Sequence, residues 1–288
     1  MNNSQLSPNL TLPVRKALGI LPYVVLAVML AVSFLPLVAM LGTSFRSFEN
    51  LYTTRTIFPD KLSLDFYRRV LGDPRIFRYF ENSFIIAAIS AFATVAMSIL
   101  GGYSMARYQR KVRGIRFFII FILMVQMFPT IQMLIPLYLT FSGLGVTNGW
   151  YTLLLAYPAF TLPMSLMMMQ SFIEGVPYEM EEAGRIDGCN RLQVILWLVI
   201  PVSRPGIASA LVLAFNFCWN EFLVAMLLIK NDAYRTMPIG LNNYMQENGS
   251  DWGSIMAAAT LMIIPVLLFL NVLQKHIVSG LTLGAVKG

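Results

Sequence analysis

The side chains of this sequence that could do chemistry are few, and several of them are polar groups inside apolar stretches. Asn216 and Asn220 lie one helical turn apart, so a helix would place them on one face, and Glu221 follows directly. Gln126 occupies another apolar stretch. Such groups either line a path for a polar solute or fasten helices together through hydrogen bonds. Both interpretations stay open for the two asparagines.

Enzymatic chemistry is not indicated. His276 is the single histidine, and Cys189 and Cys218 fall in different surroundings, one in a polar stretch and one in an apolar stretch. An enzyme would need a nucleophile with its base, or a set of metal ligands. A G-x4-G-K-[ST] loop for ATP is also missing from the sequence. We therefore predict that this chain is not an enzyme and holds no cofactor of its own.

The elements that must position these residues belong to a membrane protein. Hydrophobic residues make up 57% of the 288 residues, charged residues make up 12%, and the mean hydropathy is +0.67. Soluble domains carry about twice that fraction of charge. The net charge of +7 does not indicate nucleic acid, because basic residues that flank membrane spans are an ordinary cause of such an excess. The expected surroundings are the lipid bilayer.

Six segments have the roughly 20 apolar residues that a membrane-spanning helix needs. They predict a single all-α domain over 1–288, with kinks at the prolines of the third and fourth spans. No internal repeat is evident, which weakens the case for a secondary transporter built from inverted repeats. The predicted spans are 17–42, 83–105, 115–137, 150–172, 206–228 and 254–273.

The basic residues indicate which way the chain faces. With both termini inside, 12 of the 21 Lys and Arg residues fall in cytoplasmic segments. Segment 43–82 lies outside in this arrangement and narrows the margin, because it holds seven basic residues among five acidic ones. Its second half mixes aromatic residues with arginines, which is typical of an interfacial helix. The prediction is that both termini lie in the cytoplasm.

A polar hairpin over 176–201 separates the fourth and fifth spans. Pro177 suits the first turn of a helix, the acidic residues after it favour its N-terminal end, and Gly188 suits its stop. We expect a short helix over 177–187, with Ala183 and Gly184 on one face as a notch that another backbone can approach. The next stretch, from Asn190 to Ile200, should lie against its own bundle. On spacing alone, an ordinary surface helix is the favoured interpretation and a docking role is the alternative, because most charged helices between spans are surface helices.

The hairpin resembles the EAA motif of ABC importer permeases, E-A-A-x3-G-x9-I-x-L-P. Glu182-Ala183-Gly184 is followed by three residues, then Gly188, then nine residues and Leu198-Val199-Ile200-Pro201, with Gly184, Leu198 and Ile200 as departures. The run R-I-D-G over 185–188, QMFP over 126–129, WNEF over 219–222 and the ending GLTLGAVKG resemble the carbohydrate branch. The chain as a whole resembles the shorter, six-span permease of maltose-type sugar importers.

The resemblance implies a type I permease fold, a bacterial inner-membrane location and a multi-subunit assembly. The partners would be a second homologous permease, two ATP-binding subunits that hold ATP and Mg²⁺, and an extracytoplasmic solute-binding protein. The hairpin would be the coupling helix that sits in a groove of one ATPase. The residues that the motif assigns to coupling are Glu182, Ala183, Gly184, Asp187 and Gly188.

The resemblance also implies roles for a loop and for the tail. The loop 229–253 would contact the binding protein through Asn242, Asn243, Tyr244 and Gln246, and we expect it to have little core of its own. The tail from Gly280, with Gly284 and Lys287, would contact the ATPases and is too glycine-rich to fold alone.

The solute path would use Gln126, Asn216, Asn220 and Glu221. For Glu221 a structural partner or a gate is favoured, because a sugar offers no charge to pair with. An ABC permease for a non-sugar solute and an ion-coupled carrier are the alternatives, and the identity of the sugar stays open.

Overall fold

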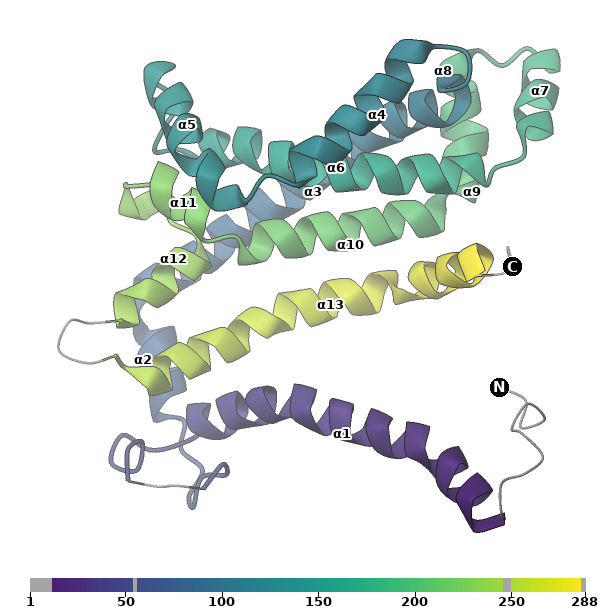
Figure 1. The fold of residues 1–288 in the computed structure, drawn as a ribbon. Coiled ribbons are helices and arrows are strands. Elements are labelled where there is room, and N and C mark those ends of the chain that lie inside the picture. The colour runs from purple at the N-terminus through teal and green to yellow at the C-terminus, as the bar shows by residue number, and fades with distance from the viewer. Residues whose placement is uncertain (1–11, 54–55, 246–249, 286–288) are drawn as a thin grey trace. The chain divides into compact units, whose positions relative to one another are not determined.

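The structure is a computed structural model that describes the backbone of residues 12–53, 56–245 and 250–285, and the side chains from residue 21 to residue 272 within those ranges. The described residues form helices and loops without a strand, as the all-α prediction requires. Four helices are long and apolar enough to cross a membrane. They are α1 (Leu12–Ser44), α3 (Pro74–Tyr108), α6 (Trp150–Glu174) and α13 (Trp252–Ala285) (Figure 1).

The third predicted span is broken instead of merely kinked. Its residues form α4 (Arg113–Gln126) and α5 (Thr130–Gly143), which are bent by 103° at a short break that contains Pro129. Proline lacks the N–H that a continuing helix would need, and it disfavours helical conformation in the residue before it. By contrast, α6 runs without interruption through Pro158 and Pro163.

The fifth predicted span is also divided. Helix α10 (Arg204–Asn220) ends before Glu221, and α11 (Leu223–Leu228) follows as a separate short helix. The stretch Arg191–Val202 before α10 passes the length and hydropathy test only together with it, and the two are bent by 82°. Within the part of the chain that the structure describes, the helices long and apolar enough to span a membrane therefore number four, or up to six if each bent pair is one span.

Short elements connect these helices. They are α2 (Asp65–Gly72), α7 (Tyr178–Ile186), α8 (Arg191–Gln193), the π-helix η2 (Val194–Val199), α9 (Ile200–Val202), the 3-10 helix η3 (Asp232–Tyr234), α12 (Met237–Leu241) and the 3-10 helix η4 (Asn242–Tyr244).

The prediction of an interfacial helix in the second half of segment 43–82 is only partly correct. Its first part is α2, but from Pro74 onward the segment is the start of the long helix α3, which Asp73 caps by accepting a hydrogen bond from the backbone N–H of Arg75 at 3.0 Å.

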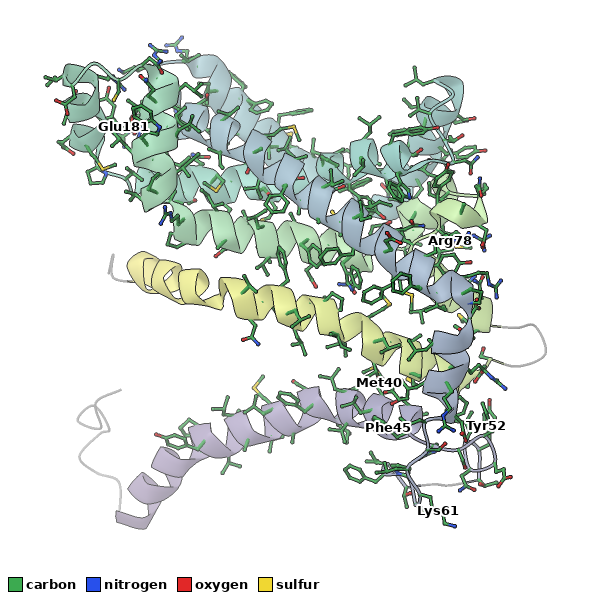
Figure 2. All side chains as sticks on the ribbon, turned by 180° about the vertical axis from the view of Figure 1, so that it is seen from behind. Met40, Phe45, Tyr52, Lys61, Arg78 and Glu181 are labelled. Carbon is green, nitrogen blue, oxygen red and sulfur yellow. The ribbon has the colours of Figure 1, made fainter. Side chains whose placement is uncertain are left out.

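The contacts group the predicted single domain into two compact units. The first unit comprises residues up to Gly72 together with 249–261. Within it, Gly253 permits close packing, because a Cβ there would lie 2.1 Å from the Phe66 ring. Arg69 donates to Asp251 Oδ2 at 2.7 Å and lies 4.2 Å from the centre of the Phe48 ring. Figure 2 labels Phe45, Tyr52 and Lys61 in the same unit.

The carboxyl group of Asp251 is held in its ionised form in this first unit. Burial opposes ionisation, but hydrogen bonds from Ser254 and Arg69 outweigh it, so the pKa of Asp251 lies below its ordinary value.

The second unit, 73–248 with 262–288, is built around α3, α6 and α10. Close approach of α3 and α6 depends on Gly102, where a Cβ would lie 2.8 Å from Met169 Cβ and 2.9 Å from the backbone nitrogen of Gln170. This agrees with the packing role expected of a glycine pair in a membrane helix. Thr94 and Thr161 join the same two helices by a 2.8 Å hydrogen bond.

Candidate functional site

The polar hairpin between α6 and α10 forms close to where the sequence predicts it. Helix α7 (Tyr178–Ile186) begins after Pro177 and ends before Gly188, whose φ of +87° lies in the left-handed region that favours glycine. The backbone N–H of Gly188 donates to the Arg185 carbonyl at 3.1 Å, which closes the last turn. Asn190 then caps the next helical stretch by accepting from the N–H of Gln193. The predicted short helix is confirmed to within one residue at each end.

The two adjacent glutamates of α7 have different surroundings. Glu181 has no exposed surface, whereas Glu182 is exposed. Arg107 Nε donates to Glu181 Oε1 at 2.7 Å, and the Tyr103 hydroxyl donates to Glu181 Oε2 at 2.8 Å. Arg185 Nη2 lies 3.6 Å from the same carboxylate. Burial without these donors would be costly for a carboxylate, so the contacts explain how Glu181 is accommodated.

Sequence reasoning missed Glu181 and its partner Arg107, which lies 74 residues earlier in the chain. The spacing of the helix gave only a partial signal. Glu181 and Gly184 are three residues apart, so they share one side of α7, but the sequence does not show that this side is the buried one. Figure 2 labels Glu181 at the hairpin.

The prediction that Ala183 and Gly184 lie on one face of the helix and form a notch there is wrong. Gly184 is buried, and a Cβ there would lie 2.5 Å from Leu198 Cδ1 of the same chain. Ala183 is exposed. The small size of Gly184 therefore allows α7 to pack on η2. The exposed side of α7 includes Glu179, Glu182, Ala183 and Ile186, and the exposed Asp187 follows directly after the helix. Gly188 is also exposed, and nothing lies within 4 Å of the position of its missing Cβ.

The second arm of the hairpin packs against its own bundle, as predicted. Val194, Ile195 and Val199 belong to a buried cluster with residues of α3, α6 and α10. The turn of π-helix here is unusual, since such turns are rare and often lie at functional positions.

The polar face of α10 is present in the structure. Asn216 and Asn220 are exposed, and Asn220 Nδ2 donates to the side-chain oxygen of Asn216 at 3.0 Å and to its carbonyl at 2.8 Å. Leu213 and Phe217 are exposed beside them, so the four residues form one stripe of α10 at helical spacing.

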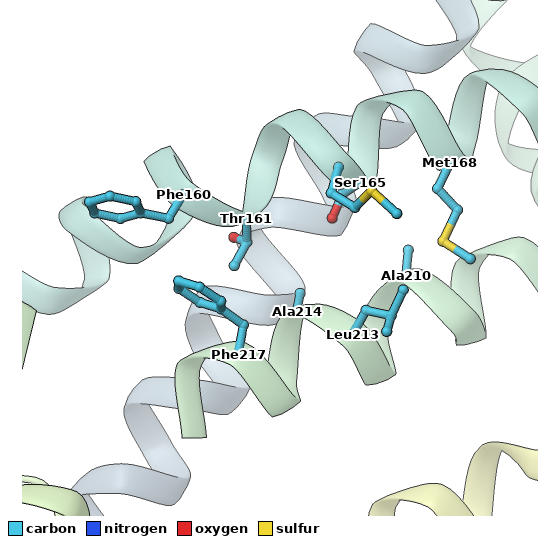
Figure 3. A pocket seen from close by; sticks show the side chains of 9 residues that line it. Phe160, Thr161, Ser165, Met168, Ala210, Leu213, Ala214 and Phe217 are labelled. Atoms are coloured by element: carbon cyan, nitrogen blue, oxygen red, sulfur yellow. The ribbon is translucent and has the colours of Figure 1, made fainter. Parts of the chain in front are cut away.

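A pocket lies between α6 and α10, next to this stripe. Its cavity volume is about 130 Å³. The rings of Phe160 and Phe217 stack at its edge, with centroids 6.3 Å apart and planes 23° apart (Figure 3). Sequence analysis did not single out these two rings. The residues that line the pocket are Phe160, Thr161, Met164, Ser165, Met168, Ala210, Leu213, Ala214 and Phe217.

Glu221 is held by its own chain. Its carboxylate accepts hydrogen bonds from the backbone N–H groups of Val224 at 2.8 Å and Ala225 at 3.0 Å, and from the Tyr157 hydroxyl at 3.3 Å. It is 9% exposed. Glu221 therefore joins α6 to the first turn of α11, which is the structural role that the sequence interpretation favoured. Gln126 is exposed at the last residue of α4, beside the 103° bend, and does not line the pocket.

Residues 229–245, which we call the α12 segment, are more ordered than predicted. Met237 is fully buried, and a Cβ on Gly240 would lie 2.4 Å from the Tyr79 ring of α3. Asn82 Nδ2 donates to the carbonyls of Ala233 and Arg235, both at 2.9 Å. The expectation that this loop lacks a core is thus wrong. The Thr-Met-Pro-Ile run, with proline in the first turn of α12, was a readable helix signal.

The candidate contact residues in the α12 segment differ in exposure. Asn242 is exposed, while Asn243 and Tyr244 are half-buried. Asn243 Nδ2 donates to the Tyr79 hydroxyl at 3.5 Å. Gln246 lies outside the described residues. In the tail, α13 stays helical through Gly284 to Ala285, so the expectation that the chain cannot fold beyond Gly280 is wrong up to that point. Lys287 lies outside the described residues.

Long apolar helices joined by a polar helical hairpin define a multi-pass membrane protein. Residues 98–283 match the family described as "Binding-protein-dependent transport system inner membrane component", and the chain belongs to this family. It is thus a permease component of a multi-subunit ABC transport system.

Relatives match over nearly their whole length. The sulfoquinovosyl glycerol transport system permease protein SmoH of Agrobacterium fabrum is 34% identical over 93% of this chain and 94% of its own length. The trehalose/maltose transport system permease protein MalG of Thermococcus litoralis is 35% identical over 91% of this chain and 95% of its own. The diacetylchitobiose uptake system permease protein DasC of Streptomyces coelicolor is 30% identical over 88% and 91%.

Solved structures share the fold. The chain resembles a chain of a bacterial ABC transporter involved in the import of the acidic polysaccharide alginate, with a TM-score of 0.79 and 22% identity over 93% of this chain and 99% of that chain. A chain of the MetNI methionine ABC transporter in an inward-facing conformation matches with a TM-score of 0.58 and 14% identity over 71% and 95%. The fold is therefore that of ABC importer permeases.

Proposed function

We propose that this chain is the membrane-spanning subunit of an ATP-driven importer of a carbohydrate, in which α7 docks on an ATP-binding subunit. The observation that carries the proposal is the two-sided character of α7. One side is packed on the chain's own bundle through Glu181 and Gly184, while Glu182, Ala183 and Asp187 are exposed. An exposed polar side on a firmly held helix suits a docking surface for a soluble partner.

The proposed assembly contains two permeases, two ATP-binding subunits and an extracytoplasmic solute-binding protein. ATP and Mg²⁺ belong to the ATP-binding subunits, and this chain contributes no ATPase activity and no cofactor. Glu182 would make charge-assisted hydrogen bonds to the ATP-binding subunit. Gly188 would allow the turn that positions α7, because its φ of +87° strains any residue with a side chain.

Carbohydrate is the proposed solute because the named relatives include permeases for trehalose/maltose, sulfoquinovosyl glycerol and diacetylchitobiose. The α10 stripe supports this choice. Asn216 and Asn220 present amides that donate and accept hydrogen bonds, and the stacked rings of Phe160 and Phe217 lie beside them. A neutral polyol can exchange water for such amides while its apolar faces pack on the rings. Gln126 and Glu221 are not assigned to this path, because one lies at the bend of α4 and the other is taken up by backbone donors.

We propose that both termini and α7 lie in the cytoplasm, with the α12 segment on the outer side. The excess of Lys and Arg in the segments that this topology places inside supports it. On the outer side, Asn242 would contact the binding protein, together with Asn243, Tyr244 and Gln246. On the inner side, the tail with Gly284 and Lys287 would contact the ATP-binding subunits.

Uptake into proteoliposomes tests this function. The chain would be reconstituted with its second permease, its ATP-binding subunits and its binding protein, with ATP trapped inside the vesicles. A panel of labelled mono-, di- and oligosaccharides should include at least one whose accumulation requires ATP and survives an uncoupler. Uptake that an uncoupler abolishes and ATP depletion leaves intact would identify an ion-coupled carrier, and ATP-driven uptake of amino acids alone would identify a non-sugar permease.

A further inference from the structure

We infer that Arg107 is the positioning residue that joins α7 to α3, through the buried carboxylate of Glu181. The inference rests on the proposed function, in which α7 receives the movement of an ATP-binding subunit. Two neighbouring glutamates then have different roles. Glu182 faces the ATP-binding subunit, and Glu181 attaches α7 to the bundle of its own chain. Neither Arg107 nor Glu181 belongs to the EAA pattern.

The geometry around Glu181 leaves little freedom for α7 to move alone. Both carboxylate oxygens accept short hydrogen bonds from α3, one from Arg107 Nε at 2.7 Å and one from the Tyr103 hydroxyl at 2.8 Å. The Arg107 side chain is only 10% exposed, and that of Glu181 is not exposed at all. Moving α7 away from α3 would break both of these hydrogen bonds and separate the buried ion pair of Glu181 with Arg107, leaving only Arg185 of α7 itself beside the carboxylate, which is unfavourable.

Arg107 also fixes the backbone just before α7. Its Nη2 donates to the carbonyl of Val176 at 2.9 Å, and Val176 is itself buried. One guanidinium therefore fixes the chain both just before the helix and one turn into it. The planar fork of arginine suits this double contact, whereas lysine presents a single ammonium group.

The end of α3 contacts the other elements of the hairpin as well. Arg191, at the start of α8, lies 5.8 Å from the centre of the Tyr108 ring. Gln109 Nε2 donates to Glu174 Oε1, at the last residue of α6. The last turn of α3 thus meets α6, α7 and α8. A push on α7 should reach α3 and α6 together, as a rigid body, instead of bending the hairpin.

A coupling measurement tests the inference in the reconstituted full complex. The variant is Glu181→Gln, which keeps the shape of the side chain and removes the charge. Its matched control is Glu81→Gln, which removes the same charge from an exposed position of α3 away from the hairpin. Solute imported per ATP hydrolysed should fall about tenfold in E181Q, within the range shown by contacting residues that are energetically coupled. It should stay within about twofold of wild type in E81Q, as is usual for exposed positions.

Arg107→Gln and the double variant R107Q/E181Q complete the cycle. R107Q leaves the buried Glu181 carboxylate with only the more distant Arg185 as ion-pair partner, whereas the double variant has no carboxylate there, so the double variant should import more per ATP than R107Q alone. A role in folding alone would lower the amount of complex and leave the ratio of import to hydrolysis unchanged. Equal ratios in E181Q, E81Q and wild type would overturn the inference.

A distance measurement keeps the test independent of the transport assay. Spin labels at Ser104→Cys on α3 and Ile186→Cys on α7 occupy exposed positions, in a background of Cys189→Ser and Cys218→Ala. The full chain in nanodiscs should show one narrow distance distribution, which E181Q broadens and Glu182→Gln leaves narrow. An unchanged distance distribution in E181Q would contradict the attachment of α7 to α3 through Glu181, even if the complex transports sugar. If instead the distance distribution broadens as expected but no ATP-dependent uptake is found, the proposed function fails, whereas the attachment of α7 to α3 through Glu181 is supported.

Discussion

Two polar segments lie at opposite ends of α3, and they are held in different ways. The α7 hairpin is attached to Tyr103 and Arg107 near the C-terminal end of the helix. The α12 segment is attached to Tyr79, Asn82 and Ser83 near its N-terminal end. In Figure 2, Glu181 and Arg78 mark these two regions.

The difference lies in how charge is used. At the hairpin, most of the attachment passes through one fully buried carboxylate and its arginine. At the α12 segment it is spread over separate bonds: Asn82 donates to two carbonyls, Ser83 Oγ accepts from the N–H of Met237, and the Tyr79 hydroxyl donates to Asp232. A buried ion pair is costly to break on one side only, whereas each hydrogen bond between neutral groups contributes roughly 1 kcal/mol. One substitution should therefore disable the hairpin, while the α12 segment should weaken in steps.

The largest effect is expected for Arg107→Met. It leaves the buried Glu181 carboxylate with the partly exposed Arg185, 3.6 Å away, as its remaining ion-pair partner, so the loss should be about 3 kcal/mol of stability, at the low end for breaking a buried pair. Thermal unfolding of the purified complex should show a clearly lowered Tm, and Arg107→Met with Glu181→Met should recover much of the loss. The control is Arg110→Met, an exposed residue just after the end of α3. The same Tm for R107M and R110M would remove the basis of the comparison.

The next effect is expected at Gly188, where strain and partner contact can be separated. Alanine and tryptophan at this position both meet the positive φ, at a cost of roughly 1–2 kcal/mol. Because nothing lies within 4 Å of the Cβ position, the bulk of tryptophan should add little within this chain. Gly188→Ala and Gly188→Trp should therefore have similar Tm values in the isolated chain.

Transport should distinguish these two variants if Gly188 lies against an ATP-binding subunit. Gly188→Trp should then lose far more stimulated ATP hydrolysis than Gly188→Ala. Wild-type transport by Gly188→Trp would contradict a coupling role for this turn.

A smaller effect is expected for Ser83→Ala at the other end of α3. The substitution removes the hydroxyl that accepts from the backbone N–H of Met237 and introduces no charge. Loss of this hydrogen bond between neutral groups should cost about 1–2 kcal/mol. Differential scanning fluorimetry should place its Tm between those of wild type and Arg107→Met. A larger loss than that of R107M would show that the α12 segment, and not the hairpin, is the more fragile attachment.

The smallest effect on stability is expected for Asn242→Ala in the α12 segment. The residue is exposed, so the change in stability should stay within about 0.5 kcal/mol. If this residue contacts the binding protein, the concentration of binding protein needed for half-maximal uptake should rise. Titration of uptake with purified binding protein measures this, and an unchanged midpoint would assign Asn242 to a solvated turn.

The sequence predicted the elements whose signals are local. The apolar runs of α1 and α6 are long enough to be recognised without a structure, and Pro177 with Gly188 bounds α7 closely. The 103° bend between α4 and α5 was predicted only as a kink, because a proline shows where regular hydrogen bonding ends but not which direction the chain takes afterwards.

The candidate site was only partly predictable for a related reason. Glu181 and Glu182 are identical side chains at adjacent positions, and only the fold decides which one meets Arg107. The pairing joins residues of different helices, so no local pattern encodes it. The same holds for Phe160 and Phe217, which stack across α6 and α10. Glu221 was favoured as a structural partner or a gate because a sugar offers no charge to pair with. The separate helical start at Leu223, whose backbone N–H groups need acceptors, was not predicted, because 206–228 was predicted as one span.

The central claim is that the α7 hairpin and the α12 segment, attached at opposite ends of α3, meet different partners. Cysteine cross-linking from these two segments tests it most directly. In a chain with Cys189→Ser and Cys218→Ala, Ala183→Cys would probe the exposed side of α7, and Asn242→Cys would probe the α12 segment. In the assembled transporter, our account predicts that Ala183→Cys cross-links to an ATP-binding subunit and that Asn242→Cys cross-links to the solute-binding protein. Cross-links to the opposite partners would contradict the account. So would the absence of any cross-link between Ala183→Cys and an ATP-binding subunit.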